Sequence, residues 1–280
     1  MSPVRRPAPG PVSGGPSGEP PGNRAQESPG RSGETWVVVP AGGRGVRMGR
    51  KKQGVPLRGR PVLRWTVDTL GRTPEVTGIV VAVPAEDVET WRRRLRSCRK
   101  VRAVVAGGRE RQDSVAQGLR AVPADVTWIA VHDGARPCLT PALVSAVLAA
   151  ARAHDAAIAA LPVAETLTRG ADGWVKDPVD RDGMWTVQTP QAFRARLLRQ
   201  AHRRAAAEGV RGTDEASLVA RLLGVRVRLV PGLPGNVKVT RPEDLPLARA
   251  LLSLGPGRGR RGPPRATRVG WRPGFVPRTR

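Results

Sequence analysis

The stretch TWVVVPAGGRGVRMGRKKQ, residues 35–53, joins an apolar run, a glycine-rich turn and a group of basic residues. Trp36 to Val39 form a run typical of a strand buried on both faces of a sheet. Pro40, which cannot donate a ladder hydrogen bond, ends that strand. The glycines that follow permit positive φ and let backbone N–H groups approach an anion. We therefore expect a strand followed by a phosphate-binding turn.

Two common nucleotide-binding motifs do not fit this turn. No Ser or Thr follows Lys52, as a P-loop requires, and Met48 stands where a dinucleotide-binding G-x-G-x-x-G pattern has its third glycine. A glycine turn followed by solvated arginines is the simpler interpretation of this stretch alone. The rest of the chain has to decide between a nucleotide site and a plain turn.

The two ends of the chain differ in composition from its middle. Residues 1–33 and 254–280 are rich in Pro and Gly and lack apolar periodicity, which predicts a disordered extension and a disordered basic tail. Residues 34–253 are long enough to bury one full core and form the expected folded domain. The formal net charge of +25 suits an anionic partner, either a phosphorylated metabolite or a nucleic acid.

The cysteines and the apolar runs indicate a compartment. Cys98 and Cys138 are the two cysteines of the chain and have neither disulfide-framework nor metal-ligand spacing. No apolar run has the length of a membrane span, and no signal peptide is recognisable. We expect a cytoplasmic protein without membrane contact.

Outward from the glycine turn, β-branched runs alternate with amphipathic stretches. Buried strands are expected at residues 78–83, 101–106, 126–131 and 156–161. Helices are expected at residues 61–71, 87–96, 113–119, 143–153, 197–208 and 214–223, the last with Thr213 as its N-cap. A strand at 225–230, a short strand at 235–240 and a helix starting at Pro242 follow. This alternation predicts an α/β fold whose mostly parallel sheet is flanked by helices.

Residues 164–176 interrupt the alternation. Ala164–Arg169 and Trp174–Lys176 flank Gly170–Gly173, which predicts a β-hairpin within an arm of about residues 162–186. A two-stranded arm is marginally stable alone, so we expect it to pack on a second copy of the chain.

Polar residues follow two of the expected strands. Gly107–Ser114 is a second glycine-and-charge turn, and His132–Pro137 comes at the carboxyl end of the strand at 126–131, where open α/β sheets bind ligands. Asp133 there suits a metal or a ribose and Arg136 a phosphate, with a simple Asp–Arg turn pair as the alternative. Lys238 lies in the expected short strand, where an edge position with the amino group in solvent is the more ordinary role.

Four motifs together resemble one enzyme family. They are Pro40–Met48, Val131–Pro137, Thr213–Ser217 and Asn236–Asp244. In this order they are similar to the 2-C-methyl-D-erythritol 4-phosphate cytidylyltransferases of the non-mevalonate isoprenoid pathway, over about residues 35–252. The resemblance implies a Rossmann-like nucleotidyltransferase fold with a mixed, mostly parallel sheet and a homodimer through the arm. It also implies Mg²⁺ held mainly by the CTP phosphates, and attack of the polyol phosphate on the α-phosphorus of CTP with release of pyrophosphate.

The resemblance further implies roles for single residues. The catalytic cations are Arg47, Lys52 and Lys238. The residues against CTP are Ala41, Gly42, Gly43, Gly108, Arg109, Ser114 and Asp133. The residues at the methylerythritol phosphate are Arg136, Thr166, Arg181, Thr189 and Thr213. Lys51 is the alternative to Lys52, because the link from Met48 is shorter than usual in the family. Arg109 replaces a commonly acidic residue at a base-contact position.

Two other functions remain open at this point. A ribitol 5-phosphate cytidylyltransferase shares the fold and the glycine turn, although Ala135 and residues 179–183 favour methylerythritol phosphate. A basic nucleic-acid-binding protein on an α/β scaffold would explain the charge. Aromatic residues make up only 3% of the chain and Tyr is absent, so stacking platforms for bases are scarce and we expect no nucleic-acid partner.

Overall fold

The chain divides into two compact units, residues 1–30 and 31–280. The computed structural model describes residues 33–43, 48–49 and 51–254, all in the second unit. Arg47 and nearly all of the two tails expected to be disordered lie outside these residues.

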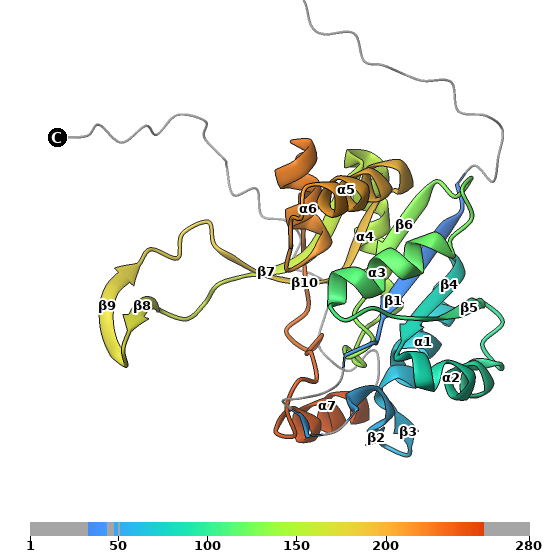
Figure 1. Cartoon of the computed structure of the whole chain (residues 1–280). Coiled ribbons are helices and arrows are strands. Elements are labelled where there is room, and N and C mark those ends of the chain that lie inside the picture. The colour runs from blue at the N-terminus through green and yellow to red at the C-terminus, as the bar shows by residue number, and fades with distance from the viewer. Residues whose placement is uncertain (1–32, 44–47, 50, 255–280) are drawn as a thin grey trace, which may run out of the picture. The chain divides into compact units, whose positions relative to one another are not determined.

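A seven-stranded sheet forms the centre of the described unit (Figure 1). In spatial order its strands are β11 (Arg228–Pro231), β7 (Ala156–Pro162), β10 (Trp185–Arg194), β6 (Trp128–Val131), β1 (Thr35–Pro40), β4 (Val76–Val83) and β5 (Val101–Ala106). Strand β10 pairs antiparallel with both of its neighbours, and the other pairs are parallel. The predicted mixed, mostly parallel sheet is confirmed.

Helices cover both faces of this sheet. One face is covered by α1 (Val62–Arg72), α2 (Val88–Leu95) and α4 (Pro141–His154), and the other by α3 (Arg111–Arg120), α5 (Ala195–Ala207) and α6 (Glu215–Leu223). The alternation along β1 explains the two layers. Val37 packs in one apolar cluster with Leu63 of α1, and Val38 packs in the other with Val115 of α3. Each fully buried valine contributes roughly 1.5–3 kcal/mol of transfer free energy.

A third, smaller apolar cluster joins parts of the chain that are distant in sequence. Its buried members are Met48, Val55, Leu57, Val62, Val239 and Ala248. They come from the segment after the glycine turn, with the short strand β2 (Pro56–Leu57), which pairs with β3 (Arg60–Pro61), from the first residue of α1, from the loop around Val239, and from α7 (Asp244–Ser253). This cluster holds the neighbourhoods of Lys52 and Lys238 to one another.

The predicted hairpin arm is present. Strands β8 (Leu167–Ala171) and β9 (Trp174–Val179) pair antiparallel and stand off the sheet on two long connections (Figure 1). Asp172 and Gly173 form the turn with φ of 52° and 84°, the left-handed geometry that a two-residue hairpin turn requires.

Four expectations for the C-terminal third are wrong. Residues 235–240 form an irregular loop rather than a strand, and β11 is shorter than the expected 225–230 strand and lies three residues later at its start. Asp214, not Thr213, caps α6, because its side chain accepts the Ser217 N–H at 3.0 Å. The last helix begins at Asp244 rather than Pro242, since the Asp244 carboxylate accepts the N–H groups of Thr240 and Arg241 and holds the preceding residues in a turn.

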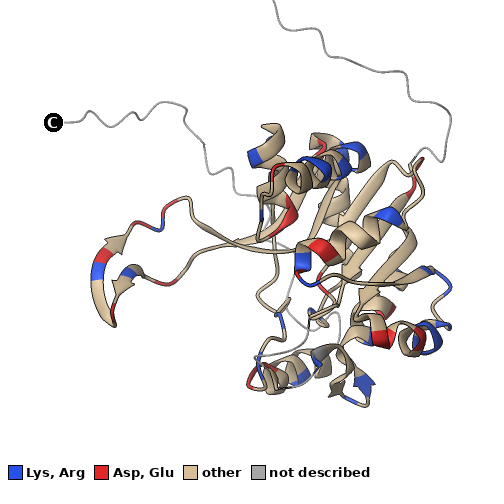
Figure 2. Cartoon of the chain, viewed as in Figure 1, with Lys and Arg blue, Asp and Glu red and all other residues tan. Residues whose placement is uncertain are grey.

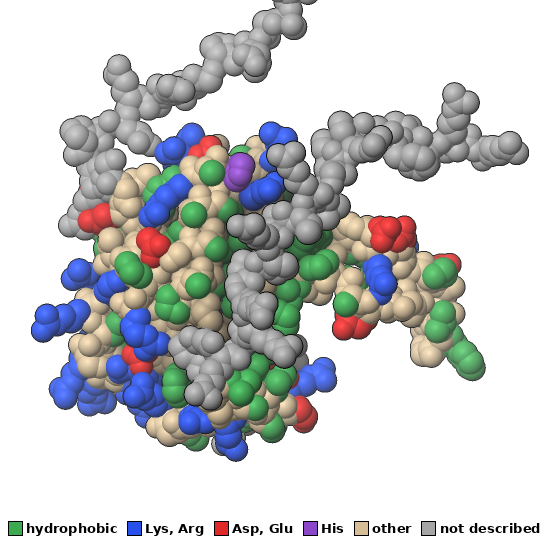
Figure 3. Space-filling model, turned by 180° about the vertical axis from the view of Figure 1, so that it is seen from behind, with side chains coloured by type: hydrophobic (Ala, Val, Ile, Leu, Met, Phe, Trp, Pro, Cys, Tyr) green, Lys and Arg blue, Asp and Glu red, His purple; other side chains and the backbone are tan. Residues whose placement is uncertain are grey.

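Charged and apolar side chains are distributed unevenly on the surface. Lysines and arginines are spread over several elements, among them α2 and α5, with acidic residues between them (Figure 2). Hydrophobic side chains lie at the far end of the arm (Figure 3), where Trp174 is 80% and Val175 77% exposed. Within the described ranges, no helix is both long and apolar enough to cross a membrane.

Candidate active site

The two glycine-containing turns and the end of β6 enclose a cavity of about 260 Å³ at the carboxyl ends of parallel strands. Its lining residues are Pro40, Ala41, Gly42, Gly43, Gln53, Gly108, Arg109, Glu110, Arg111, Ser114, Asp133, Gly134, Ala135 and Lys238. Every residue that the sequence assigns to CTP is in this set. The cavity brings together residues from five separate segments of the chain.

Ser114 closes the second turn and lies directly against Gly42 of the first. Its Oγ accepts the Gly108 N–H at 3.2 Å and lies within hydrogen-bonding distance, 3.1 Å, of the Glu110 carbonyl. A Cβ added to Gly42 would lie 2.9 Å from this Oγ. Glycine at position 42 is therefore required for the close approach of the first turn to the second, in addition to any ligand contact.

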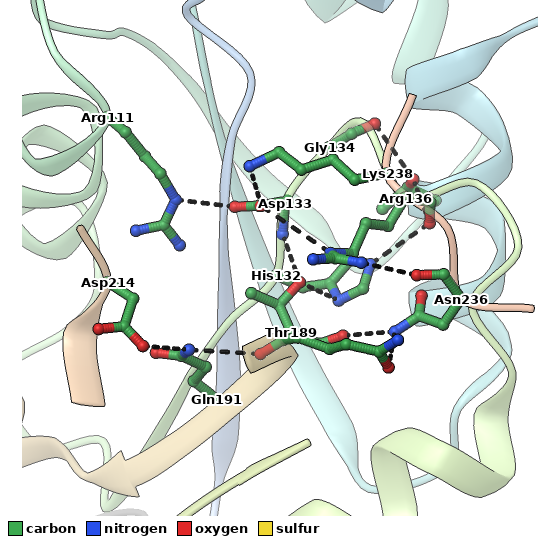
Figure 4. A network of polar contacts seen from close by, with 12 residues as sticks. Arg111, His132, Asp133, Gly134, Arg136, Thr189, Gln191, Asp214, Asn236 and Lys238 are labelled. Atoms are coloured by element: carbon green, nitrogen blue, oxygen red, sulfur yellow. Dashed lines mark hydrogen bonds and ion pairs between the residues drawn. The ribbon is translucent and has the colours of Figure 1, made fainter. Parts of the chain in front are cut away.

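Asp133 is the point where the charges of the site converge (Figure 4). Its Oδ1 accepts a hydrogen bond from Arg111 Nε at 2.8 Å, and its Oδ2 lies 2.6 Å from Lys238 Nζ. Arg136 Nε is 4.0 Å from the same Oδ2. Burial alone would raise the pKa of the Asp133 carboxyl, but the charges of Arg111 and Lys238 outweigh it and hold that pKa well below its ordinary range.

Arg111 links Asp133 to a second buried acid. Its Nη1 and Nη2 each donate to one oxygen of Glu215 at 2.9 Å, a bidentate pair. Burial raises the pKa of Glu215, and the Arg111 charge opposes that rise. Burial alone would lower the pKa of Arg111, but Glu215 and Asp133 together raise it. The guanidinium therefore stays charged between two anions.

A neutral histidine lies under the site. The Asp133 N–H donates to Thr189 Oγ1 at 3.1 Å, and Thr189 Oγ1 lies 3.1 Å from His132 Nδ1. With its hydroxyl proton directed at Nδ1, Thr189 leaves the His132 proton on Nε2, 3.4 Å from the Arg136 carbonyl. Burial lowers the pKa of His132 to about 4, so the ring is uncharged at neutral pH.

Lys238 is held in place by hydrogen bonds of its loop, which lacks strand structure. Asn236 Nδ2 donates to the Thr189 carbonyl at 2.8 Å and to Gln188 Oε1 at 3.2 Å. The Val239 N–H donates to the Ala135 carbonyl at 2.8 Å. These bonds tie the residues on both sides of Lys238 to β10 and to the loop after β6, so the ammonium points into the cavity toward Asp133 (Figure 4). The edge-residue alternative for Lys238 is wrong.

The residues assigned to the polyol phosphate fall into two groups. Thr189 is buried beside Asp133, and the neighbouring Arg136 side chain is 11% exposed. Arg136 Nη1 donates to the Asn236 carbonyl at 2.6 Å, and its Nε has no hydrogen-bond partner among the described residues. Thr166 and Arg181 are exposed on the connections of the arm, and Arg181 donates to the Ala164 carbonyl. Thr213 lies at an adjoining surface pocket with Arg109 and Arg111. The structure does not bring the second group into the cavity of the same chain.

The two candidate lysines have different surroundings. Lys51 Nζ pairs with Glu86 at 2.7 Å and with Asp87 at 2.8 Å, on the outer side of the segment. Lys52 begins the 3₁₀ turn η2 (Lys52–Gly54), and the next residue, Gln53, lines the cavity. The side chain of Lys52 and the whole of Arg47 lie outside the described part of the structure.

Sequence reasoning missed several residues of the site. Arg111 and Glu215 lie 104 positions apart, and no local pattern pairs them. A signal was available for Glu215, which is a charged residue inside an apolar helical pattern. Asn236 lies at the start of one of the four motifs and Gln188 lies outside them, and amide side chains that orient a loop carry no distinctive spacing.

No group of three or more His, Cys, Asp and Glu side chains arranged for a metal ion occurs among the described residues. Asp133, the buried carboxylate of the cavity, already has Arg111 and Lys238 as partners. The donor set of the cavity therefore does not amount to a protein-built metal site.

Comparison with known proteins adds an independent line of evidence. Residues 35–254 match the family model described as 2-C-methyl-D-erythritol 4-phosphate cytidylyltransferase. Proteins of that name from Symbiobacterium thermophilum and Syntrophotalea carbinolica are 48% and 45% identical to this chain, over 77% and 78% of it and over 92% and 95% of their own length. The crystal structure of the protein of that name from Thermus thermophilus matches at a TM-score of 0.66 with 34% identity, covering 77% of this chain and 98% of that one.

Proposed function

The chain belongs to the 2-C-methyl-D-erythritol 4-phosphate cytidylyltransferase family, and on this premise we propose how its cavity serves the reaction. The enzyme transfers the cytidylyl group of CTP to 2-C-methyl-D-erythritol 4-phosphate and releases pyrophosphate, a step of isoprenoid precursor synthesis. The ribitol phosphate and nucleic-acid alternatives have no comparable support.

The observation that carries the proposal is the joining of the glycine turns and Lys238 in one cavity. Gly42 and Gly43 line it, and glycines in such a turn can present backbone N–H groups to phosphate oxygens. Asp133 aligns the Lys238 ammonium at 2.6 Å. Phosphoryl-type transfer requires two polyanions to be held together and their charge neutralised. A cavity of this composition meets that requirement.

In the proposed reaction an oxygen of the methylerythritol phosphate attacks the α-phosphorus of CTP. The bond from that phosphorus to the bridging oxygen of the β-phosphate breaks, and pyrophosphate leaves with the electron pair. Lys238 and Lys52 stabilise the charge on the α-phosphate, and Arg47 the charge on the leaving group. Ala41, Gly108, Arg109 and Ser114 lie against the nucleoside, and Asp133 keeps Lys238 oriented.

The polyol phosphate is proposed to bind at Arg136 and Thr189, with Thr213 at the margin. Arg136, next to Asp133, has an Nε–H that makes no hydrogen bond in the described ranges and is only weakly paired with Asp133 Oδ2 at 4.0 Å, which suits a phosphate. Thr166 and Arg181 lie on the arm, so we assign them to the site of a second copy in a homodimer. The exposed Trp174 and Val175 at the arm's end support contact with that copy.

Magnesium and the compartment are also part of the proposal. Mg²⁺ supplies charge neutralisation and is proposed to arrive with the triphosphate of CTP, since the cavity does not provide a carboxylate set for it. The two cysteines are free thiols, in keeping with the reducing cytoplasm. Residues 34–253 are the proposed catalytic domain, and a chain limited to them should retain turnover.

Pyrophosphate release by the purified full chain, with CTP and each of two polyol phosphates, tests the function. We expect turnover with methylerythritol 4-phosphate and far less with ribitol 5-phosphate. Faster turnover of ribitol 5-phosphate, or none with either, would contradict the proposal.

A further inference from the structure

Gln53 is a buried amide of the cavity that the reaction scheme leaves unused. It lines the cavity with Asp133 and Lys238, and only 3% of its surface is exposed. Within the described part of the chain, neither its Nε2 nor its Oε1 has a hydrogen-bond partner. It follows Lys52 in η2 and precedes Val55, which is buried in the third apolar cluster, so the backbone on that side is anchored.

An unpartnered amide of this kind is unfavourable in the free protein. A buried donor or acceptor without a partner loses its hydration and gains nothing in return, and folded proteins leave few such groups. Gln191 shows the ordinary arrangement in this chain. It is 0% exposed, its Nε2 donates to the Asp214 carboxylate at 2.8 Å, and its Oε1 accepts the Glu215 and Ala216 N–H groups, both at 3.1 Å.

We propose that Gln53 is a substrate-contacting residue whose amide is satisfied only when the cavity is filled. Its Nε2 can donate to any phosphate or hydroxyl oxygen. Its Oε1 needs a donor, and ionised phosphates have no proton to give. The partner therefore carries a donor, which on these substrates is a hydroxyl group of the ribose or of the polyol, or the amino group of cytosine. The inference rests on the proposed function and adds to it a residue that contacts a hydrogen-bond donor of the substrate.

The substitution Gln53→Met tests this proposal with two measurements, the melting temperature of the free protein and the KM for each substrate. A structural role would change the melting temperature, whereas a substrate contact changes a KM alone. Met keeps the length of the side chain and removes both polar atoms. Because no described group bonds to the Gln53 amide, the melting temperature of the free protein should stay unchanged or rise by up to about 4 °C. The KM for CTP or for the polyol phosphate should rise at least about tenfold, the loss expected for a substrate hydrogen bond.

Gln191→Met is the matched control, since it removes an equally buried amide whose partners lie within the protein. Its melting temperature should fall by about 4 °C or more. Separate KM measurements show which substrate Gln53 contacts: a change for CTP indicates the nucleoside, and a change for methylerythritol phosphate indicates the polyol. Either result supports the inference.

Two results would overturn it. One is a melting temperature of Gln53→Met that falls as far as that of Gln191→Met, which would make Gln53 a structural residue. The other is less than about a threefold change in both KM values. A wild-type protein that releases no pyrophosphate would instead count against the proposed function. In that case the rise in melting temperature on adding CTP alone, or the polyol phosphate alone, still tests Gln53. Equal rises for the wild type and Gln53→Met with both ligands would contradict the contact.

Discussion

At the scale of single residues, Asp133 organises the charge of the cavity. It is buried, and it stays ionised because Arg111 and Lys238 bond to its two oxygens. Removing one member of a buried charge network leaves another charge without compensation, which typically costs about 3–5 kcal/mol. Asp133 is therefore both a structural anion and the reason why Lys238 has a defined position.

The adjacent lysines give a paired prediction. Lys52→Met should lower kcat by about 10²–10³, the effect of removing one charge-stabilising group from a transition state. Lys51→Met should change kcat less than about threefold, because Lys51 is occupied by Glu86 and Asp87 at the surface. Steady-state pyrophosphate release measures both. Loss of turnover only in Lys51→Met would move the catalytic role by one residue.

The buried histidines predict a stability change on mild acidification. Burial lowers the pKa of His202 to about 4, as it does for His132. The pKa of a histidine in the unfolded chain is 6.5, so between pH 6.5 and about pH 4 the unfolded chain binds the proton and the native protein does not. The free energy of unfolding is therefore full above pH 6.5 and decreases as pH falls through this window. His202→Leu should reduce the loss of unfolding free energy from pH 7 to pH 5 by about 2 kcal/mol.

Urea denaturation at the two pH values measures this difference. Lys176→Gln, at an exposed position on β9 of the arm, is the control. Its loss of unfolding free energy from pH 7 to pH 5 should equal that of the wild type. An identical pH dependence in His202→Leu and the wild type would refute the assignment to His202.

At the scale of elements, the caps of α6 show how a helix start is decided. Asp214 accepts the Ser217 N–H and also receives Gln191 Nε2 at 2.8 Å, whereas no hydrogen bond of the Thr213 side chain is found in the described structure. Asp214→Ala should therefore cost at least about 1 kcal/mol, and Thr213→Ala less than about 0.5 kcal/mol. Thermal or urea unfolding of the two variants compares them, and equal losses would contradict the capping role of Asp214.

The same elements show what the sequence can and cannot predict. Val37, Val80 and Ile129 lie in β-branched runs buried on both faces, and such runs predicted β1, β4 and β6. Residues 225–240 alternate like strands, yet only β11 pairs with the sheet, because pairing at that edge depends on β7 and not on local pattern. Gly42, Asp133 and Lys238, which the motifs single out, line the same cavity. The Arg111–Glu215 pair was not predicted, since it forms only when α3 and α6 meet.

At the scale of the whole molecule, the arm predicts association of two copies. Trp174→Glu with Val175→Glu places charges on its two most exposed large apolar side chains. Sedimentation velocity should show a dimer for the wild type and a monomer for this variant, because desolvating carboxylates in an apolar contact is unfavourable. Leu247→Glu on α7, where Leu247 is 52% exposed, is the control and should remain dimeric. A monomeric wild type at micromolar concentration would contradict the arm contact.

The attachment of the arm has a consequence for how such proteins diverge. Strands β7 and β10 are antiparallel neighbours whose pairing reaches Pro162 and Trp185, so the arm is topologically the loop of a hairpin. The sheet would close equally well over a much shorter connection. Changes of length or sequence in the arm leave the register of the sheet intact, so the arm can diverge in its partner contacts as long as Thr166 and Arg181 keep their proposed place in the second copy's site.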